Sequence, residues 1–318
     1  MENYKLTYPV LACRRLRAAC LVVSIAFIAG CAANTSSVAD VSNTTSEGSN
    51  TPQVQPATVK SVKPEFHDSH FHLTNYIQQG ISIDEYLSIM GDRVGRSTLF
   101  GIPLQQTWSY HNSGDFAPTY YLHSDAPLYY YSFTDAYIAR LYQQLPAEKQ
   151  KRFDPMITGF NPADMYATDH IRRVLTLFPG VFSGIGEFTI HKEFVSAKVA
   201  GNTASLTDPA LDRIFELCAE VGLVALLHND IDMPFANEGP MPVYFEQFTE
   251  TLRRHPKTTI IWAHIGLGRV VRPIQTVASA GSTERSVGHI AMVEYLLKDP
   301  TLNHVYFDIS WDEVAKYV

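Results

Sequence analysis

The sequence contains few cysteines and, after residue 17, no cluster of basic residues. Of its four cysteines, Cys13, Cys20 and Cys31 lie near the N-terminus and Cys218 stands alone, so we expect no intramolecular disulfide in the rest of the chain. The 25 basic residues are scattered and are outnumbered by 32 acidic ones, which argues against nucleic acid or an anionic membrane surface as the main partner. The chain also lacks an internal repeat and a glycine-rich phosphate loop.

Residues 18–28, AACLVVSIAFI, form an apolar run that is too short to span a bilayer comfortably. Basic residues precede this run, as in a signal peptide. It ends in IAGC (28–31), which resembles the lipobox of bacterial lipoproteins. We therefore expect a signal peptide over residues 1–30, lipidation of Cys31, membrane attachment through that lipid only, and a periplasm-facing location at the outer membrane. An uncleaved N-terminal membrane anchor is the alternative.

Residues 32–64 are rich in Ser, Thr, Asn, Val and Pro and contain no aromatic residue. Such a composition cannot bury a core, so we expect residues 31–64 to be a disordered tether that begins at the lipidated cysteine. Aromatic and β-branched residues appear abruptly at Glu65. We therefore expect a single folded domain over residues 65–318.

Short apolar runs alternate with amphipathic segments throughout this domain, which is typical of an α/β fold with a parallel sheet. We predict strands at residues 66–71, 97–102, 155–159, 182–188, 223–227, 259–263 and 305–309. Helical spacing is clearest at residues 209–221 and 244–254. An open doubly wound sheet and a closed (β/α)8 barrel of the TIM type both fit this alternation.

Polar residues at the ends of the predicted strands favour the barrel. They are His70, His72, Glu187, His228 and His264. A barrel brings the C-terminal ends of all its strands to one rim, where residues far apart in sequence converge, whereas an open sheet would spread them along an edge.

This set of residues predicts a metal site. His70 and His72 are two residues apart, so they project to the same side of an extended segment. A divalent ion needs several nitrogen or oxygen donors at about 2.0 to 2.2 Å. One such histidine could be structural, but a buried polar residue without a partner is unfavourable. Four histidines and a glutamate at strand ends are therefore better explained together, as ligands.

Residues 104–142 form an insertion that is rich in tyrosine. A loop of this length is usually functional or disordered, and this one is too aromatic to be disordered. We expect a lid over the rim, with Tyr130 contacting substrate. Contact with a second copy of the chain is the alternative, because interfaces also favour tyrosine. His191 and Lys192, beyond Glu187, lie either near substrate or in a solvated loop.

The segments HDSHFH, GIGEF, LLHND, WAHIG and VYFDIS, in this order, resemble the metal-dependent amidohydrolase superfamily, in particular its decarboxylase- and lactonase-like branch. The resemblance implies a (β/α)8 barrel in which His70, His72 and His228 bind a divalent metal, usually zinc. It implies that His264 is catalytic, either binding a second metal or polarising the substrate, and that Glu187 is a further ligand, so one or two ions are expected. Asp68 matches a residue that orients a ligand histidine.

The sequence departs from this family at its end. The family's eighth strand carries an aspartate that takes the proton from the attacking water, yet only seven strands are predicted here. We therefore expect the barrel to be incomplete at its C-terminus. Asp308 would be the eighth-strand aspartate only if the order assigned to the strands is wrong by one. Otherwise we expect Asp308, like Arg269, to lie where substrate binds.

The expected activity is hydrolysis of an ester, lactone or amide bond in a small organic molecule by metal-activated water. Nonoxidative decarboxylation on the same metal is the alternative reaction. A lipid-anchored binding protein that retains a metal pocket without turnover is the alternative of another class.

Overall fold

The computed structural model describes residues 63–75, 78–104, 107–108, 122–123, 130–192, 204–233, 242–268, 289–311 and 314. The expected signal peptide, Cys31, nearly all of the tether, Arg269 and most of the aromatic insertion lie outside these residues. Among the helices of the described residues, none is long and apolar enough to cross a membrane.

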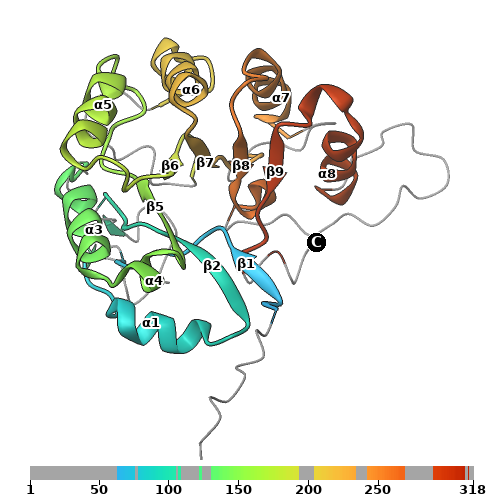
Figure 1. Cartoon of the computed structure of the whole chain (residues 1–318). Coiled ribbons are helices and arrows are strands. Elements are labelled where there is room, and N and C mark those ends of the chain that lie inside the picture. The colour runs from blue at the N-terminus through green and yellow to red at the C-terminus, as the bar shows by residue number, and fades with distance from the viewer. Residues whose placement is uncertain are drawn as a thin grey trace, which may run out of the picture. The chain divides into compact units, whose positions relative to one another are not determined.

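Seven parallel strands form one curled sheet with helices on its outer side (Figure 1). In chain order and in spatial order alike, the strands are β1 (Phe66–Asp68), β2 (Val94–Leu99), β5 (Phe153–Ile157), β6 (Gly184–Thr189), β7 (Val224–His228), β8 (Ile260–Trp262) and β9 (Val305–Phe307). This order is that of a TIM-type barrel. It confirms the predicted α/β class and the (β/α)8 architecture, with seven strands in the described part of the chain.

Helices follow the strands along the chain. They are α1 (Ile83–Met90), α3 (Phe133–Gln144), α4 (Ala147–Gln150), α5 (Ala167–Leu177), α6 (Pro209–Val221), α7 (Phe245–Arg254) and α8 (His289–Lys298), with short 3₁₀ helices η2 (Ala263–Gly266) and η3 (Pro300–Leu302). Within the insertion, β3 (Thr107–Trp108) and β4 (Leu122–His123) form a separate parallel pair.

Helix α6 illustrates how the sequence sets these elements. The Asp208 side chain accepts a hydrogen bond from the Ala210 N–H, and Pro209 occupies the first turn, where its missing N–H costs nothing. Gly222 ends the helix in the left-handed conformation (φ 76°). The apolar residues of its helical repeat are buried: Ala210, Leu211, Ile214, Phe215, Leu217 and Cys218. Burying each large side chain among them stabilises the fold by about 1.5 to 3 kcal/mol.

The two faces of the sheet are filled by different side chains because strand residues alternate in direction. In β7, Ala225 and Leu227 belong to the main core beneath the helices. Leu226 belongs instead to a smaller cluster with Phe100, Met156 and Ala263. The Phe100 ring lies 5.5 Å from the His70 ring and 4.6 Å from the His72 ring, measured between centroids. This smaller cluster therefore forms an apolar floor beneath the histidines.

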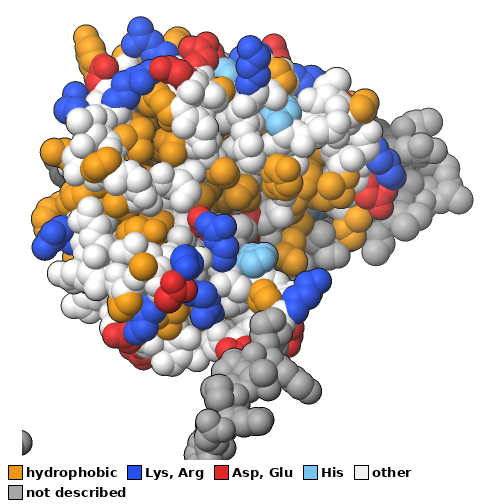
Figure 2. All heavy atoms as spheres, viewed as in Figure 1, with side chains coloured by type: hydrophobic (Ala, Val, Ile, Leu, Met, Phe, Trp, Pro, Cys, Tyr) orange, Lys and Arg blue, Asp and Glu red, His pale blue; other side chains and the backbone are white. Residues whose placement is uncertain are grey.

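Basic and acidic side chains are intermixed on the face that Figure 2 shows. Arg96–Asp154 and Arg172–Glu220 are ion pairs between neighbouring elements.

Candidate metal centre

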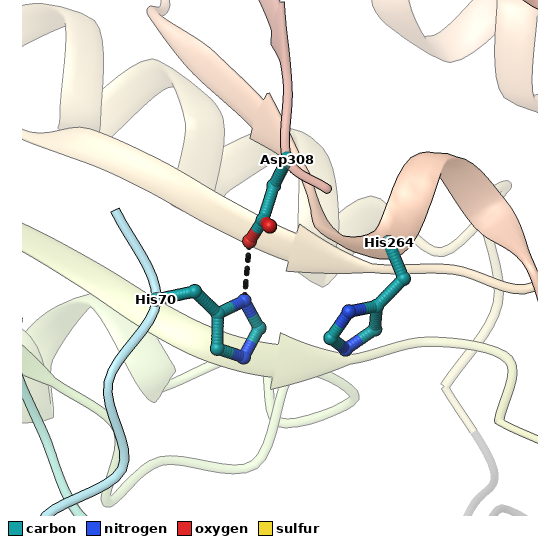
Figure 3. Close-up of side chains that lie close together, drawn as sticks. All are labelled: His70, His264 and Asp308. Carbon is teal, nitrogen blue, oxygen red and sulfur yellow. Dashed lines mark hydrogen bonds and ion pairs between the residues drawn. The ribbon is translucent and has the colours of Figure 1, made fainter. Parts of the chain in front are cut away.

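Four histidines and two carboxylates from five different strands meet at the C-terminal end of the sheet. His70 and His72 follow β1, Glu187 lies in β6, His228 ends β7, His264 lies in η2 after β8, and Asp308 follows β9. Figure 3 shows His70, His264 and Asp308 pointing toward one another from three separate segments. The structure thus brings together all five of the residues that the sequence analysis assigned to a metal, with Asp308 beside them.

Two local features differ from the predicted strands. β1 ends at Asp68, after a register shift, and the chain pairs again only at His72, which forms an isolated parallel bridge with Phe100. Glu187 lies inside β6, not at its end, at a register shift between Gly186 and Phe188. Gly186 has φ 115°, and a Cβ there would lie 2.2 Å from the Leu226 carbonyl oxygen. Only glycine therefore fits beside Glu187.

Glu187 occupies the centre of the cluster, and its two oxygens face different histidine pairs. Oε2 lies 3.1 Å from His72 Nε2 and 3.7 Å from His70 Nε2. Oε1 contacts His228 Nδ1 and lies 3.7 Å from His264 Nε2. The Lys192 ammonium lies 3.9 Å from the same Oε1. Lys192 therefore lies beside the cluster, and its contact with substrate stays a prediction.

Each of three histidines has the ring nitrogen that does not face Glu187 directed to another polar group. His70 Nδ1 pairs with Asp308 Oδ2 at 2.5 Å, and His228 Nε2 lies 3.0 Å from Asp230 Oδ1. His264 Nδ1 lies 3.3 Å from Ser310 Oγ. His72 differs, because its Nδ1 is buried and has no hydrogen-bond partner.

His264 is presented by a strained turn. His264 (φ 54°) and Ile265 (φ 47°) both adopt the left-handed conformation, which costs free energy for residues with a Cβ. Gly266 continues the turn at φ 73°, where a Cβ would lie 1.9 Å from the Trp262 ring. The His289 side chain, in the first turn of α8, donates to the Ile265 carbonyl oxygen at 2.7 Å. These contacts hold a backbone conformation that turns the His264 ring toward Glu187.

Asp68 binds the backbone of His70 and not its ring. The Asp68 carboxylate accepts from the His70 N–H at 2.9 Å and from the Tyr86 hydroxyl at 3.1 Å. Asp68 therefore fixes the chain just before the two histidines, which is one way of orienting a ligand histidine.

Burial and the carboxylates act in opposite directions on the histidine pKa values. Burial lowers the pKa of His70, but Asp308 and Glu187 outweigh burial and raise it to about 9. Burial prevails at His72 and His264, where it lowers the pKa to about 4. Burial raises the pKa of Glu187, but Lys192 and His228 outweigh this and hold it well below its usual value. Glu187 is thus an anion surrounded by imidazoles.

The donor set fits a divalent cation. The Nε2 atoms of His70 and His72 are 3.0 Å apart, close to the separation of about 3.3 Å expected for two nitrogens on one tetrahedral ion at 2.0 to 2.1 Å. Three overlapping groups have ligand atoms within 4.8 Å of one another: His70, His72 and Glu187; Glu187, His228 and His264; His70, His264 and Asp308. Imidazole nitrogens and carboxylate oxygens of this kind suit zinc and related metals.

The structure describes only some of the residues that were predicted to contact substrate. Asp308 is buried, and its carboxylate oxygens are engaged by His70 Nδ1 and by the Ser310 N–H. Tyr130 pairs with Leu104 at the base of the insertion, and burial raises the pKa of its phenol. Arg269 lies outside the described residues. Substrate contacts by these residues stay predictions.

Asp230 and Ser310 were missed by the sequence analysis. Asp230 carried a usable signal, because it lies two residues after His228 and so on the same side of an extended chain. Ser310 had no such signal, since its contact depends on the turn at His264.

Comparison with known proteins places this geometry in a family. A family model described as amidohydrolase matches residues 67–313. Among solved structures, a probable 2-pyrone-4,6-dicarboxylic acid hydrolase from Acinetobacter baumannii is 9% identical over 64% of this chain and 58% of its own, with a TM-score of 0.34. A 2,6-dihydroxybenzoate decarboxylase from Rhizobium is 11% identical over 80% of this chain and 92% of its own, with a TM-score of 0.43.

A dihydroorotase from Campylobacter jejuni is 10% identical over 77% of this chain and 54% of its own, with a TM-score of 0.36. The chain therefore spans less than two thirds of the length of the pyrone hydrolase and of the dihydroorotase. A search among curated proteins gave no match. The family model covers most of the chain, including every strand from β2 to β9 and all of the converging histidines and carboxylates. The chain belongs to the amidohydrolase family.

Proposed function

We propose that this protein is a metal-dependent hydrolase that cleaves an ester, lactone or amide bond in a small organic substrate. The observation that carries the proposal is the position of Glu187, whose two oxygens each face a separate pair of histidines. A purely structural role for five converging polar side chains would leave the strained turn that presents His264 without a purpose.

His70, His72, Glu187, His228 and His264 would hold the metal, for which zinc is the best fit to nitrogen and carboxylate donors. One or two ions can be accommodated, because the carboxylate of Glu187 reaches both histidine pairs. When bound, such an ion polarises a carbonyl oxygen and lowers the pKa of water. The apolar floor around Phe100 excludes water from beneath the site, which strengthens these electrostatic effects.

The protein's own groups would position the reaction. His264, neutral at pH 7 because burial lowers its pKa, would hold a second ion or donate a hydrogen bond to the oxygen anion that develops on the carbonyl. Lys192 adds a positive charge beside Glu187 Oε1 that favours the same anion. Tyr130, Arg269 and Asp308 would contact the substrate, with the aromatic insertion favouring an apolar or cyclic molecule.

Turnover by the full chain, loaded with zinc, tests the proposal. Esters, lactones, amides and carboxylated aromatics would be screened by titrating acid release at constant pH and by measuring carbon dioxide. We expect acid release that a chelator abolishes and zinc restores. Carbon dioxide without acid release would establish the decarboxylase alternative instead. Stoichiometric metal without turnover of any substrate would support the binding-protein alternative.

We further propose that Cys31 carries a lipid that anchors the chain on the periplasmic side of the outer membrane, and that the partner at the site is a small molecule. The support is the IAGC segment after the apolar run. The mass of the N-terminal peptide of the protein from membranes tests this, since cleavage before Cys31 and acylation predict a defined increase, whereas an intact N-terminus contradicts it.

A further inference from the structure

Asp230 lies next to the candidate metal centre but on its outer side. Its Oδ1 is 3.0 Å from His228 Nε2, while His228 Nδ1 contacts Glu187 Oε1. All three side chains are buried. None of the three groups of converging ligand atoms in the described residues includes Asp230. His228 therefore lies between two carboxylates, with only one of them at the centre of the cluster.

The Asp230 carboxylate is fixed by its surroundings. The Asp230 N–H donates to the His191 carbonyl oxygen at 2.8 Å, and the Ile231 N–H donates to the Gly266 carbonyl oxygen at 2.8 Å. Gly268 lies against the carboxylate, because a Cβ at Gly268 would come within 2.9 Å of Oδ2 and 3.1 Å of Cγ. A side chain at residue 268 would thus push the carboxylate away, and glycine leaves it room beside His228.

We propose that Asp230 is a positioning residue that acts through His228. A carboxylate oxygen accepts hydrogen bonds, so Asp230 holds a ring hydrogen on Nε2 and makes Nδ1 the nitrogen that is available to a metal in the cluster. It also fixes the ring's orientation and makes Nδ1 more basic, and a metal-binding histidine needs both. The inference rests on the proposed function in one respect, namely that the cluster binds a metal.

The reverse arrangement at His70 supports the argument. There Asp308 engages Nδ1 and leaves Nε2 facing Glu187 and His72. A carboxylate thus engages one ring nitrogen of each of these two buried histidines, although Asp308, unlike Asp230, also belongs to one of the groups of converging ligand atoms. In both cases the other ring nitrogen is the one that faces Glu187.

Three substitutions in the full chain separate the parts of this proposal. Asp230→Leu removes the acceptor at nearly constant size, and Asp230→Asn keeps an acceptor but removes the charge. Gly268→Ala keeps the carboxylate and displaces it. Asp212→Leu is the matched control, because Asp212 accepts from His255 Nε2 at 2.7 Å in another carboxylate–histidine pair, between α6 and α7.

Two measurements are informative: the zinc dissociation constant from competition with a chromophoric chelator, and the visible spectrum of the cobalt(II)-loaded protein. We expect Asp230→Leu to weaken zinc binding by about 10- to 100-fold and to alter the cobalt spectrum. Asp230→Asn and Gly268→Ala should give dissociation constants and spectra between those of this variant and the wild type. Asp212→Leu should match the wild type in both. Unchanged affinity and spectrum in a folded Asp230→Leu protein would overturn the proposal.

Nitrogen-15 NMR of histidine in the metal-free wild type gives an independent answer, even where a variant does not fold. We expect His228 to carry a hydrogen on Nε2, whether or not Nδ1 also carries one towards Glu187, and an Nε2 without hydrogen would overturn the proposal. If the wild type binds no metal, the proposed function fails, while this spectrum still decides whether Asp230 sets the state of His228.

Discussion

Replacing Glu187 by glutamine should remove metal-dependent stabilisation and weaken the metal-free fold as well. Glutamine keeps the size of the side chain but loses the negative charge that both histidine pairs face. In the metal-free protein, His70 has a pKa of about 9 and is protonated at pH 7, so the substitution removes one of its two carboxylate partners. Because Asp308 still pairs with His70, the cost should be less than the penalty of about 3 to 5 kcal/mol for leaving a buried charge without a partner.

The metal-dependent part follows from binding linkage. At free zinc equal to 100 times the dissociation constant, the wild type gains about 2.7 kcal/mol. A 100-fold weaker variant at the same zinc concentration gains only about 0.4 kcal/mol. In a domain of this size, 2.7 kcal/mol corresponds to a rise in Tm of roughly 5 to 10 °C. The variant should show almost none of this rise.

Thermal unfolding of both proteins, with chelator and with zinc, provides the assay. Glu294→Gln is the control, because Glu294 is an exposed residue paired with Lys298 at 2.8 Å and should change stability by no more than about 0.5 kcal/mol. A Glu187→Gln protein that is as stable as the wild type with chelator, and that zinc stabilises equally, would refute the role assigned to this carboxylate.

Two further substitutions test the surrounding structure. Burial raises the pKa of Asp135 from 3.8 to about 7, although hydrogen bonds from Thr158 and Gly159 oppose this rise. The folded state therefore binds the proton more tightly than the unfolded state does. As a result, the free energy of unfolding should fall between about pH 4 and 7, by up to about 1.4 kcal/mol per pH unit. Asp135→Asn should flatten this slope in denaturant titrations, and an unchanged slope would contradict it. Gly266→Ala places a methyl group 1.9 Å from the buried Trp262 ring, at a residue with φ 73°. We expect the free energy of unfolding to fall by more than about 1 kcal/mol and the tryptophan emission to shift. Wild-type values for both would show that the turn tolerates a side chain.

The fold was predictable because its signal is local and repeated. Each apolar run followed by an amphipathic segment specifies one strand and one helix, and caps such as Asp208 and Gly222 mark the ends of a helix in the sequence itself. The end of β1 was placed too late, because the register shift before Asp68 arises from pairing with β2 and leaves no mark in the residue pattern of β1.

The candidate site was predictable at the level of residue types. His70, His72, Glu187, His228 and His264 stood out as polar residues at the ends of apolar runs, and a barrel places such residues together. The sequence could not reveal which nitrogen of each ring faces Glu187, because this depends on partners from other strands, such as Asp308 for His70. Nor could it reveal the left-handed turn at His264, since the next residue, Ile265, is β-branched and disfavours that conformation.

The central claim is that His70 and His72 help to bind a metal, and the metal content of the purified full chain tests it most directly. The wild type and a His70→Ala/His72→Ala variant would be exposed to excess zinc, freed of unbound metal and analysed by elemental mass spectrometry, with circular dichroism to verify folding. We predict stoichiometric zinc in the wild type and a large loss in the folded double variant. Full metal content in a normally folded double variant, or none in the wild type, would contradict the account.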